Sequence, residues 1–179
     1  MFVTDAIILA KRAVNLAGQD GLSFMLAREL RLTIHGTLGF AALTSPTFAD
    51  ALDSVRRYLH LRVPFLSMSQ SEAGDQVLVK LCTEFEVPGL YPFLAETVSA
   101  TLILLTEQLL DREDAAKHGF ALEDGKLPGV TVRLSAPEPP WYQRFADQLP
   151  VRFEYGQADE MMVFPRELLD VRMRLADAE

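Results

Sequence analysis

Apolar residues recur at intervals of three and four through the first third of the chain, the spacing of one face of a helix. A first helix is predicted to begin at Thr4 and to end near Gly18, and Asp20 is the predicted cap of a second helix. The predicted buried side of the first helix consists of Ile7, Ile8, Ala10, Val14 and Leu16. That of the second consists of Leu22, Met25, Leu26 and Leu30.

The clearest helix signal begins at Ser45-Pro46. A serine hydroxyl can accept hydrogen bonds from free backbone amides at a helix start, and proline at the first helical position loses no needed donor. The apolar face that follows consists of Phe48, Leu52, Val55 and Leu59. The pattern therefore predicts an amphipathic helix that ends near Leu61.

At Pro64 the period changes from helical to alternating. The alternation continues on both sides of Glu72-Ala73-Gly74-Asp75, which predicts a β-hairpin that turns at these four residues. The positions expected on its inner face are Phe65, Ser67, Val77, Val79 and Leu81.

A long helix is predicted from Pro92 to Asp114. Four consecutive apolar residues, 102–105, cover every face of a helical turn, so the middle of this helix is predicted to be buried all round. Such a helix is either the central core element or part of a dimer interface.

The last third of the chain mixes short strands and helices. Residues 130–135 alternate as a strand, a proline-rich stretch precedes a short helix at 141–149, and 151–165 are predicted to form a second hairpin. A helical turn at 166–170 follows.

This order of elements predicts a single α+β domain over residues 1–179, with N-terminal helices, a largely antiparallel sheet built from hairpins, and a long buried central helix. Residues 1–19 are expected to be a helical extension, and 171–179 the start of a linker.

The charge balance excludes direct DNA binding by this chain. Its 17 Lys+Arg against 25 Asp+Glu give a net charge of −8, whereas DNA affinity is built largely from basic contacts to phosphates. The longest strongly apolar stretch, residues 97–106, is about half of the ~20 residues that span a bilayer, so no membrane association is expected. The single cysteine, Cys82, requires no oxidising compartment, which favours a cytoplasmic location.

Signatures of enzymes and metal sites are missing from the sequence. The histidines, His35, His60 and His118, are far apart, and no metal-binding spacing surrounds them. No phosphate-binding glycine loop and no GxSxG motif occurs, and Cys82 lies inside an alternating strand, where a buried inert thiol is expected. No catalytic residue, no metal and no cofactor is therefore predicted, and the chain is not expected to be an enzyme.

Some polar and aromatic residues allow either a structural or a ligand-binding interpretation. Glu96 lies on the otherwise apolar long helix, where it either favours the helix N-terminus or contacts a ligand or partner. Tyr58 and Arg62 lie near a helix C-terminus, where a cation is favourable without any ligand. Trp141 and Tyr142 either pack a short helix onto the sheet or line a pocket.

Two segments of the chain resemble one protein family. In residues 38–81 the shared features are Gly39, Ser45-Pro46-Thr47, Ala51-Leu52, Tyr58 and Arg62. In residues 130–179 they are Pro137, Tyr142, Phe145, Pro150-Val151, Phe153, Val163-Phe164-Pro165, Leu169-Asp170 and Leu175-Ala176-Asp177. In order and spacing these motifs resemble the arabinose-binding-type effector domain at the N-terminus of AraC/XylS-type transcription regulators.

The resemblance implies an effector-sensing and dimerisation domain of a cytoplasmic transcription regulator. In this family two helix-turn-helix motifs follow the domain, and none occurs in these 179 residues. We therefore expect DNA to be bound only through a C-terminal domain absent from this chain. The expected partners are a small-molecule effector and a second copy of the chain.

The effector is expected to be small and to carry an anionic or amphipathic group, because Arg62, Arg133 and the aromatic residues are the available contacts. The candidate ligand-binding residues are Tyr58, Arg62, Glu96, Arg133, Trp141 and Tyr142. The alternative, from another class of function, is a protein–protein interaction module without a small-molecule ligand.

Overall fold

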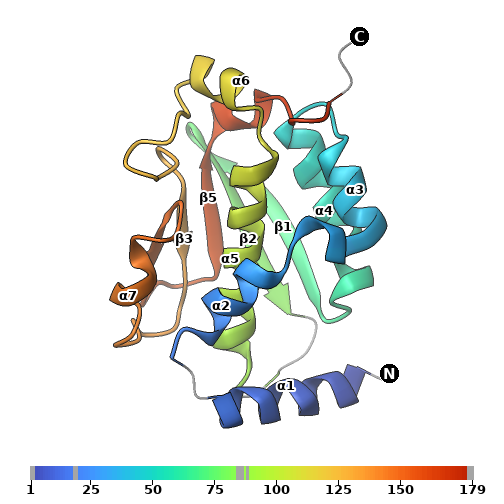
Figure 1. The fold of residues 1–179 in the computed structure, drawn as a ribbon, viewed down its shortest axis with the longest axis vertical. Helices are drawn as coiled ribbons and strands as arrows, with labels where there is room; N and C mark the ends of the chain where they lie inside the picture. Colours follow the sequence, from blue (N-terminus) through green and yellow to red (C-terminus); the bar gives the residue numbers. More distant parts are fainter. Residues whose placement is uncertain (1–2, 18–19, 84–86, 88, 177–179) are drawn as a thin grey trace.

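A computed structural model describes residues 3–17, 20–83, 87 and 89–176 of the chain (Figure 1). It contains a five-stranded sheet in the order β1-β2-β5-β3-β4, with helices packed against it. The strands are β1 (Leu66–Ala73), β2 (Gln76–Thr83), β3 (Thr131–Arg133), β4 (Arg152–Glu154) and β5 (Met161–Pro165). All neighbouring strands are antiparallel except β3 and β4, which confirms the predicted α+β class.

Seven α-helices and two short 3-10 helices are described. The α-helices are α1 (Val3–Ala17), α2 (Leu22–Glu29), α3 (Gly36–Leu43), α4 (Phe48–Arg62), α5 (Tyr91–Leu109), α6 (Arg112–Lys117) and α7 (Gln143–Ala146). The 3-10 helices are η1 (Leu32–His35) and η2 (Arg166–Asp170). None of the described helices is long and apolar enough to cross a membrane.

The predicted first hairpin is present as β1 and β2, which turn at Gly74 and Asp75. Val77, Val79 and Leu81 are buried, as predicted. On β1 the inner positions are Leu66 and Met68, whereas the sequence placed Ser67 there. Because successive side chains of a strand point to opposite faces, this one-residue difference in register exchanges the two faces of β1.

The predicted second hairpin is wrong. Residues 152–154 and 161–165 are strands, but β3 lies between them and pairs with both, parallel to β4 and antiparallel to β5. Alternation along a strand shows which residues face the core, and it does not identify the neighbouring strand. With β3 in the middle, Val132, Phe153 and Met162 lie in register on one buried face.

Helix α5 lies across one face of the sheet, and α2 packs against the side of α5 that faces away from the sheet (Figure 1). Ser99, Ala100 and Ile103 are fully buried, and Leu102 and Leu104 are half-buried against the core. The predicted burial of this helix is therefore confirmed, and it is a core element of the domain. Full burial of a side chain such as that of Ile103 contributes about 1.5–3 kcal/mol.

Helix α2 turns a different face to the core from the one predicted. Ser23, Phe24 and Ala27 are buried, whereas Met25 is 54% exposed and Leu26 is also exposed. The reason is an aromatic cluster: the Phe24 ring packs against Trp141, Tyr142, Phe145 and Phe153, with centroids 5.2–6.1 Å apart. One large ring held among four others determines which face of this short helix is buried.

The starts of two helices also differ from the prediction. The N-cap of α2 is Gly21, with a φ of 78°, and the Asp20 side chain forms an ion pair with Arg144 instead. The cap of α4 is Thr47, which exchanges hydrogen bonds with Asp50 in a capping box. The Ser45 hydroxyl donates to a carbonyl of the preceding helix, so it does not cap α4.

The first helix buries less than its pattern indicates. Val14 is buried, but Ile8 is exposed and Leu16 is 88% exposed. At the other end of the chain, Val171 and Met173 are fully buried. The backbone of Arg172 forms an isolated antiparallel β-bridge with that of Thr47. Residues 171–173 are thus packed into the fold.

Candidate functional site

A cavity of about 350 Å³ opens beside the first turns of α5. We name it the Glu96 cavity. Its walls are the start of α5, the proline-rich segment that follows β3, and Tyr155 after β4. The lining residues are Gly89, Pro92, Phe93, Glu96, Leu134, Ala136, Pro137, Glu138, Pro139, Pro140, Trp141 and Tyr155.

Glu96 is the buried polar group of this cavity. Its side chain is held by two hydroxyl donors, Ser23 of α2 on one carboxyl oxygen and Tyr155 on the other, the latter at 2.5 Å. Only 7% of the residue is exposed, and burial raises the pKa of its carboxyl group, while the two hydrogen bonds lower it. A carboxyl group buried at this depth must be hydrogen-bonded, because burying even a neutral amide or hydroxyl without a partner costs on the order of 2–7 kcal/mol, and an ionised carboxylate costs more.

Tyr155 is fixed from two directions. Its ring packs against that of Tyr142 at 5.0 Å, and its hydroxyl donates to Glu96. Burial, and then the neighbouring Glu96, raise the pKa of Tyr155 far above its ordinary value. Tyr142 is itself held by the Phe153 amide, which donates to its hydroxyl at 3.0 Å. The Tyr155 hydroxyl therefore remains a donor in a preset position.

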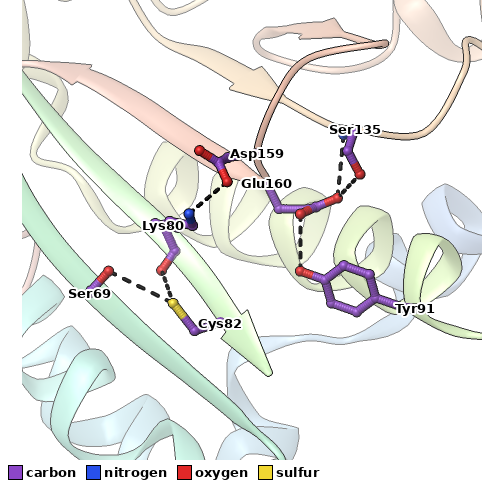
Figure 2. A network of polar contacts seen from close by, with 7 residues as sticks. All are labelled: Ser69, Lys80, Cys82, Tyr91, Ser135, Asp159 and Glu160. Carbon is purple, nitrogen blue, oxygen red and sulfur yellow. Dashed lines mark hydrogen bonds and ion pairs between the residues drawn. The ribbon is translucent and has the colours of Figure 1, made fainter. Parts of the chain in front are cut away.

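A second buried glutamate has the same kind of partners (Figure 2). Glu160, just before β5, accepts hydrogen bonds from the Tyr91 hydroxyl at 3.1 Å and from the amide and hydroxyl of Ser135. Burial raises the pKa of Tyr91, followed in effect by the charge of Glu160. This network joins the first residue of α5 to the segment after β3. Both segments form walls of the Glu96 cavity. Glu160 therefore links these two walls through its hydrogen bonds, although it does not itself line the cavity.

Figure 2 also shows the surroundings of this network. Lys80 of β2 forms an ion pair of 2.6 Å with Asp159, and the thiol of Cys82 lies 3.9 Å from the Ser69 hydroxyl. The ion pair is substantially exposed, so it contributes little, about 0–1 kcal/mol.

The walls of the Glu96 cavity are apolar and acidic. Four prolines, Phe93, Trp141 and Tyr155 provide apolar surface, and Glu96 and Glu138 provide carboxyl groups. No lysine, arginine or histidine is among the described residues that line it. This chemistry suits a ligand with an apolar body and hydrogen-bond donors.

The six predicted binding residues are not all in one place. Glu96 and Trp141 line the cavity, and Tyr142 supports it from behind through Tyr155. Arg133 lies on the strand face opposite to the buried Val132 and pairs with Glu154 at 3.5 Å.

The other two predicted residues lie on α4. Tyr58 is 46% exposed there. Arg62 is the last residue of the same helix, and its side chain lies outside the described part of the structure. Tyr58 is not among the described residues that line the Glu96 cavity.

Sequence reasoning missed Ser23, Glu138, Tyr155 and Glu160. Ser23 was missed because the opposite face of α2 was taken as buried. Glu160 had one available signal: it stands directly before the apolar run Met161–Phe164, where an acid next to a buried strand needs partners. Nothing in the local sequence pairs Tyr155 with Glu96, which lies 59 positions away.

A second cavity, of about 200 Å³, lies between α3, α4 and α5. Its lining is mostly aliphatic, and it includes Leu38, Leu59 and Leu102. Binding sites combine apolar walls with a few convergent polar groups, so the Glu96 cavity is the stronger candidate. Among the described residues, no three His, Cys, Asp or Glu side chains form a group that could hold a metal ion.

Comparisons with known proteins agree with this fold. The family model for the arabinose-binding domain of AraC transcription regulators, N-terminal, matches residues 3–173. The ornithine utilization regulator of Pseudomonas aeruginosa is 28% identical over 171 residues, which cover 94% of this chain and 46% of that protein. The crystal structure of transcriptional regulator CdpR from Pseudomonas aeruginosa has the same fold, with a TM-score of 0.70 at 18% identity, covering 93% of this chain and 50% of that one.

The family-model match defines the class of domain, which is the one found at the N-terminus of AraC transcription regulators. The chain belongs to the family of arabinose-binding domains of AraC transcription regulators, which confirms the resemblance found in the sequence. It spans about half the length of the relatives it matches, and these relatives are regulators, not enzymes.

Proposed function

We propose that this chain is the effector-sensing domain of an AraC-type regulator in the cytoplasm, and that the Glu96 cavity binds the effector. One observation carries the proposal: Glu96, a residue only 7% exposed, lines a cavity of about 350 Å³ together with three aromatic residues. That volume lies in the range of small-molecule sites, about 300–1,000 Å³. It fits a metabolite and excludes a polymer.

The contacts of Glu96 supply a route from ligand to regulator. Through Ser23 and Tyr155, this side chain joins α2, α5 and the segment after β4. A ligand that competes for Glu96, or that adds to its contacts, binds one arrangement of these elements better than another and so shifts their populations. In the full-length protein a DNA-binding domain outside this chain responds to that shift. The sensing domain itself is not an enzyme.

The name of one relative supports a small organic effector. The ornithine utilization regulator is 28% identical to this chain along 94% of its length. We propose that this chain responds to a small metabolite, with Glu96 and Trp141 as contacts. Tyr142 acts indirectly, by positioning Tyr155.

A thermal-shift screen of metabolites against the 179-residue chain tests the proposal. A ligand that binds only the folded chain at 100 times its dissociation constant adds about 2.7 kcal/mol to the free energy of unfolding. We expect at least one such compound, and we expect Tyr155→Phe to reduce its effect while Tyr58→Phe, on α4, does not. Stabilisation that is equal in both variants would place the ligand elsewhere.

Homodimerisation is the second part of the proposal, and exposed apolar side chains support it. Phe40 of α3 is 66% exposed, and Leu61 of α4 is exposed as well. Two copies that bury these side chains would remove apolar area from water. Analytical ultracentrifugation is expected to show a dimer that Phe40→Ser weakens, and a monomer at high concentration would contradict it.

The same exposed side chains favour a second candidate function, a protein-interaction module without a small-molecule ligand. The two functions differ in the metabolite screen. A ligand that stabilises the chain through Tyr155 supports sensing, and silence across all classes of metabolite favours the interaction module.

A further inference from the structure

We infer that the Glu96 cavity selects effectors that carry a positively charged amino group on an apolar body. The inference rests on the proposed function, because it names the chemical class of ligand for the same cavity. It replaces the anionic ligand that the arginines of the sequence led us to expect.

Charge is the first argument. Glu96 and Glu138 both line the cavity, and no basic side chain is among the described lining residues. A ligand carboxylate or phosphate would meet two acids and no cation at a partly desolvated site, where like charges repel strongly. An ammonium group would meet opposite charges there. Arg133, which could have received an anion, lies on the other face of its strand and pairs with Glu154.

Hydrogen-bond capacity is the second argument. Each carboxylate oxygen has two acceptor sites, and the internal partners use one on each: Ser23 donates to Oε2 and Tyr155 to Oε1. One site on each oxygen is left for a ligand. An ammonium group brings three donors and no acceptor, so it adds to these contacts without displacing either hydroxyl. An ionised Glu96 has no proton to donate. A ligand that carries only hydrogen-bond acceptors can therefore bond to it only when the carboxyl group is protonated.

The apolar walls are the third argument. Phe93, Trp141 and Tyr155 line the same cavity as the acid, and so do the prolines at 92, 137, 139 and 140. Aromatic faces attract cations, and proline and aromatic walls also bury methylene or aryl groups of a ligand. The cavity therefore combines an anionic group with an apolar space of small volume, which matches an alkylamine or arylalkylamine.

The test uses matched probes that differ only in their terminal groups, one in the hexyl and phenethyl sets and two in the five-carbon set. The amines are hexylamine, phenethylamine and cadaverine. Their uncharged counterparts are hexanol, phenethyl alcohol and pentanediol, and their acidic counterparts are hexanoate, phenylacetate and glutarate. Isothermal titration of the 179-residue chain at neutral pH is expected to show at least one amine that binds about tenfold or more tightly than its alcohol and its acid.

Substitutions then locate the preference. Glu96→Gln keeps the size of the side chain and removes its charge; its one amide oxygen can accept from only one of the two hydroxyls, and its amide nitrogen donates to the other. This variant is expected to reduce the amine's affinity at least about tenfold while changing that of the alcohol little. Glu138→Gln is expected to have a smaller effect in the same direction, because this residue is more exposed. The control, Glu167→Gln on η2, changes the net charge equally but lies on the exposed surface, and it is expected to have no effect.

The outcomes separate this inference from the proposed function. Alcohols or acids that bind as tightly as the amines, or a screening hit without a cationic group whose effect needs Tyr155, would overturn the inference and leave the sensing function in place. If no probe binds and no metabolite stabilises the chain, both the inference and the proposed sensing function are overturned. If Glu96→Gln fails to fold, Tyr155→Phe retains the carboxylate, and the amine preference is expected to persist in it.

Discussion

At the scale of single residues, two buried glutamates, Glu96 and Glu160, join distant parts of the domain. Each is held by one serine and one tyrosine that come from distant parts of the chain, Ser23 and Tyr155 for Glu96, Ser135 and Tyr91 for Glu160. The two differ in surroundings, because Glu96 lines a cavity and Glu160 lies between the cavity walls. One is placed to meet a ligand and the other to hold the cavity in shape.

The raised pKa of Glu96 has a consequence for stability. Because burial raises it above 4.5, the folded chain holds this proton at pH values where the unfolded chain has released it. The contribution of Glu96 to the free energy of unfolding therefore falls as pH rises from 4.5 through the raised pKa. Groups that face Glu96 are Ser23, Tyr155, Tyr142 and Glu138, and none of the tyrosines titrates in this range.

Urea unfolding across this pH range checks the prediction. Glu96→Gln is expected to remove the fall, so that its curve of unfolding free energy against pH is flatter than that of the wild type. Glu167→Gln, on the exposed surface, is the control and should retain the wild-type slope. Equal slopes for the wild type and Glu96→Gln would show that Glu96 is not buried as described.

Gly21 is the residue at which the backbone conformation is most restrictive. Its φ is 78°, and a Cβ atom placed there would lie 2.1 Å from Cε2 of Phe145. Gly21→Ala is expected to destabilise the fold by about 2–4 kcal/mol, from backbone strain plus displacement of that ring. Gly74→Ala, with a φ of 60° and nothing within 4 Å, is the matched control and should lose only the strain, about 1–2 kcal/mol. Denaturant unfolding measures both, and equal losses would contradict the close contact.

At the scale of elements, short-range signals located the helices and strands, and long-range contacts decided how they are oriented. The β1–β2 hairpin and α4 are largely as their local patterns predict, because the turn at Gly74 and the face of Phe48, Leu52 and Leu59 are local features. The orientation of α2 is not local. It depends on Phe24 meeting the rings of Phe145 in α7 and Phe153 in β4, more than a hundred residues later.

The cap of α4 gives a prediction at this scale. Thr47→Ala removes the capping box with Asp50 and is expected to cost about 1 kcal/mol in the free energy of unfolding. Ser45→Ala, which the sequence alone would have identified as the cap, is expected to cost less, because its hydroxyl only donates to the Ala41 carbonyl. Thermal unfolding of the two variants ranks them, and the opposite ranking would restore serine as the cap.

At the scale of the whole molecule, the sheet and α2 enclose α5, and α1 lies at one end of the fold (Figure 1). The side chains of α5 are buried or half-buried through its middle turns, whereas α1 exposes Ile8, Leu9 and Leu16. Local stability follows burial, because exposed elements open without unfolding the core.

Hydrogen exchange is therefore expected to be uneven along the chain. Amides in the middle of α5 and in β2 should exchange only on global unfolding, and those of α1 should exchange far faster. Mass spectrometry of peptides from the two helices measures this difference directly. Comparable protection of α1 would indicate that its exposed face is covered in solution, for example by a second copy of the chain.

The sequence by itself determined the class of fold, most of the elements, the family and two of the residues that line the Glu96 cavity, Glu96 and Trp141. Hydrophobic period, turn residues and caps are local, and the order of the family's motifs is a property of the chain alone. Glu96 could be singled out because an acid on an apolar helix needs an explanation. Only the tertiary structure decided that β3 separates β4 from β5, that Ser23 and Tyr155 hold Glu96, and that Arg133 lies away from the cavity. These features depend on contacts between residues far apart in sequence, and no local pattern of polarity specifies which distant partner a buried group will meet.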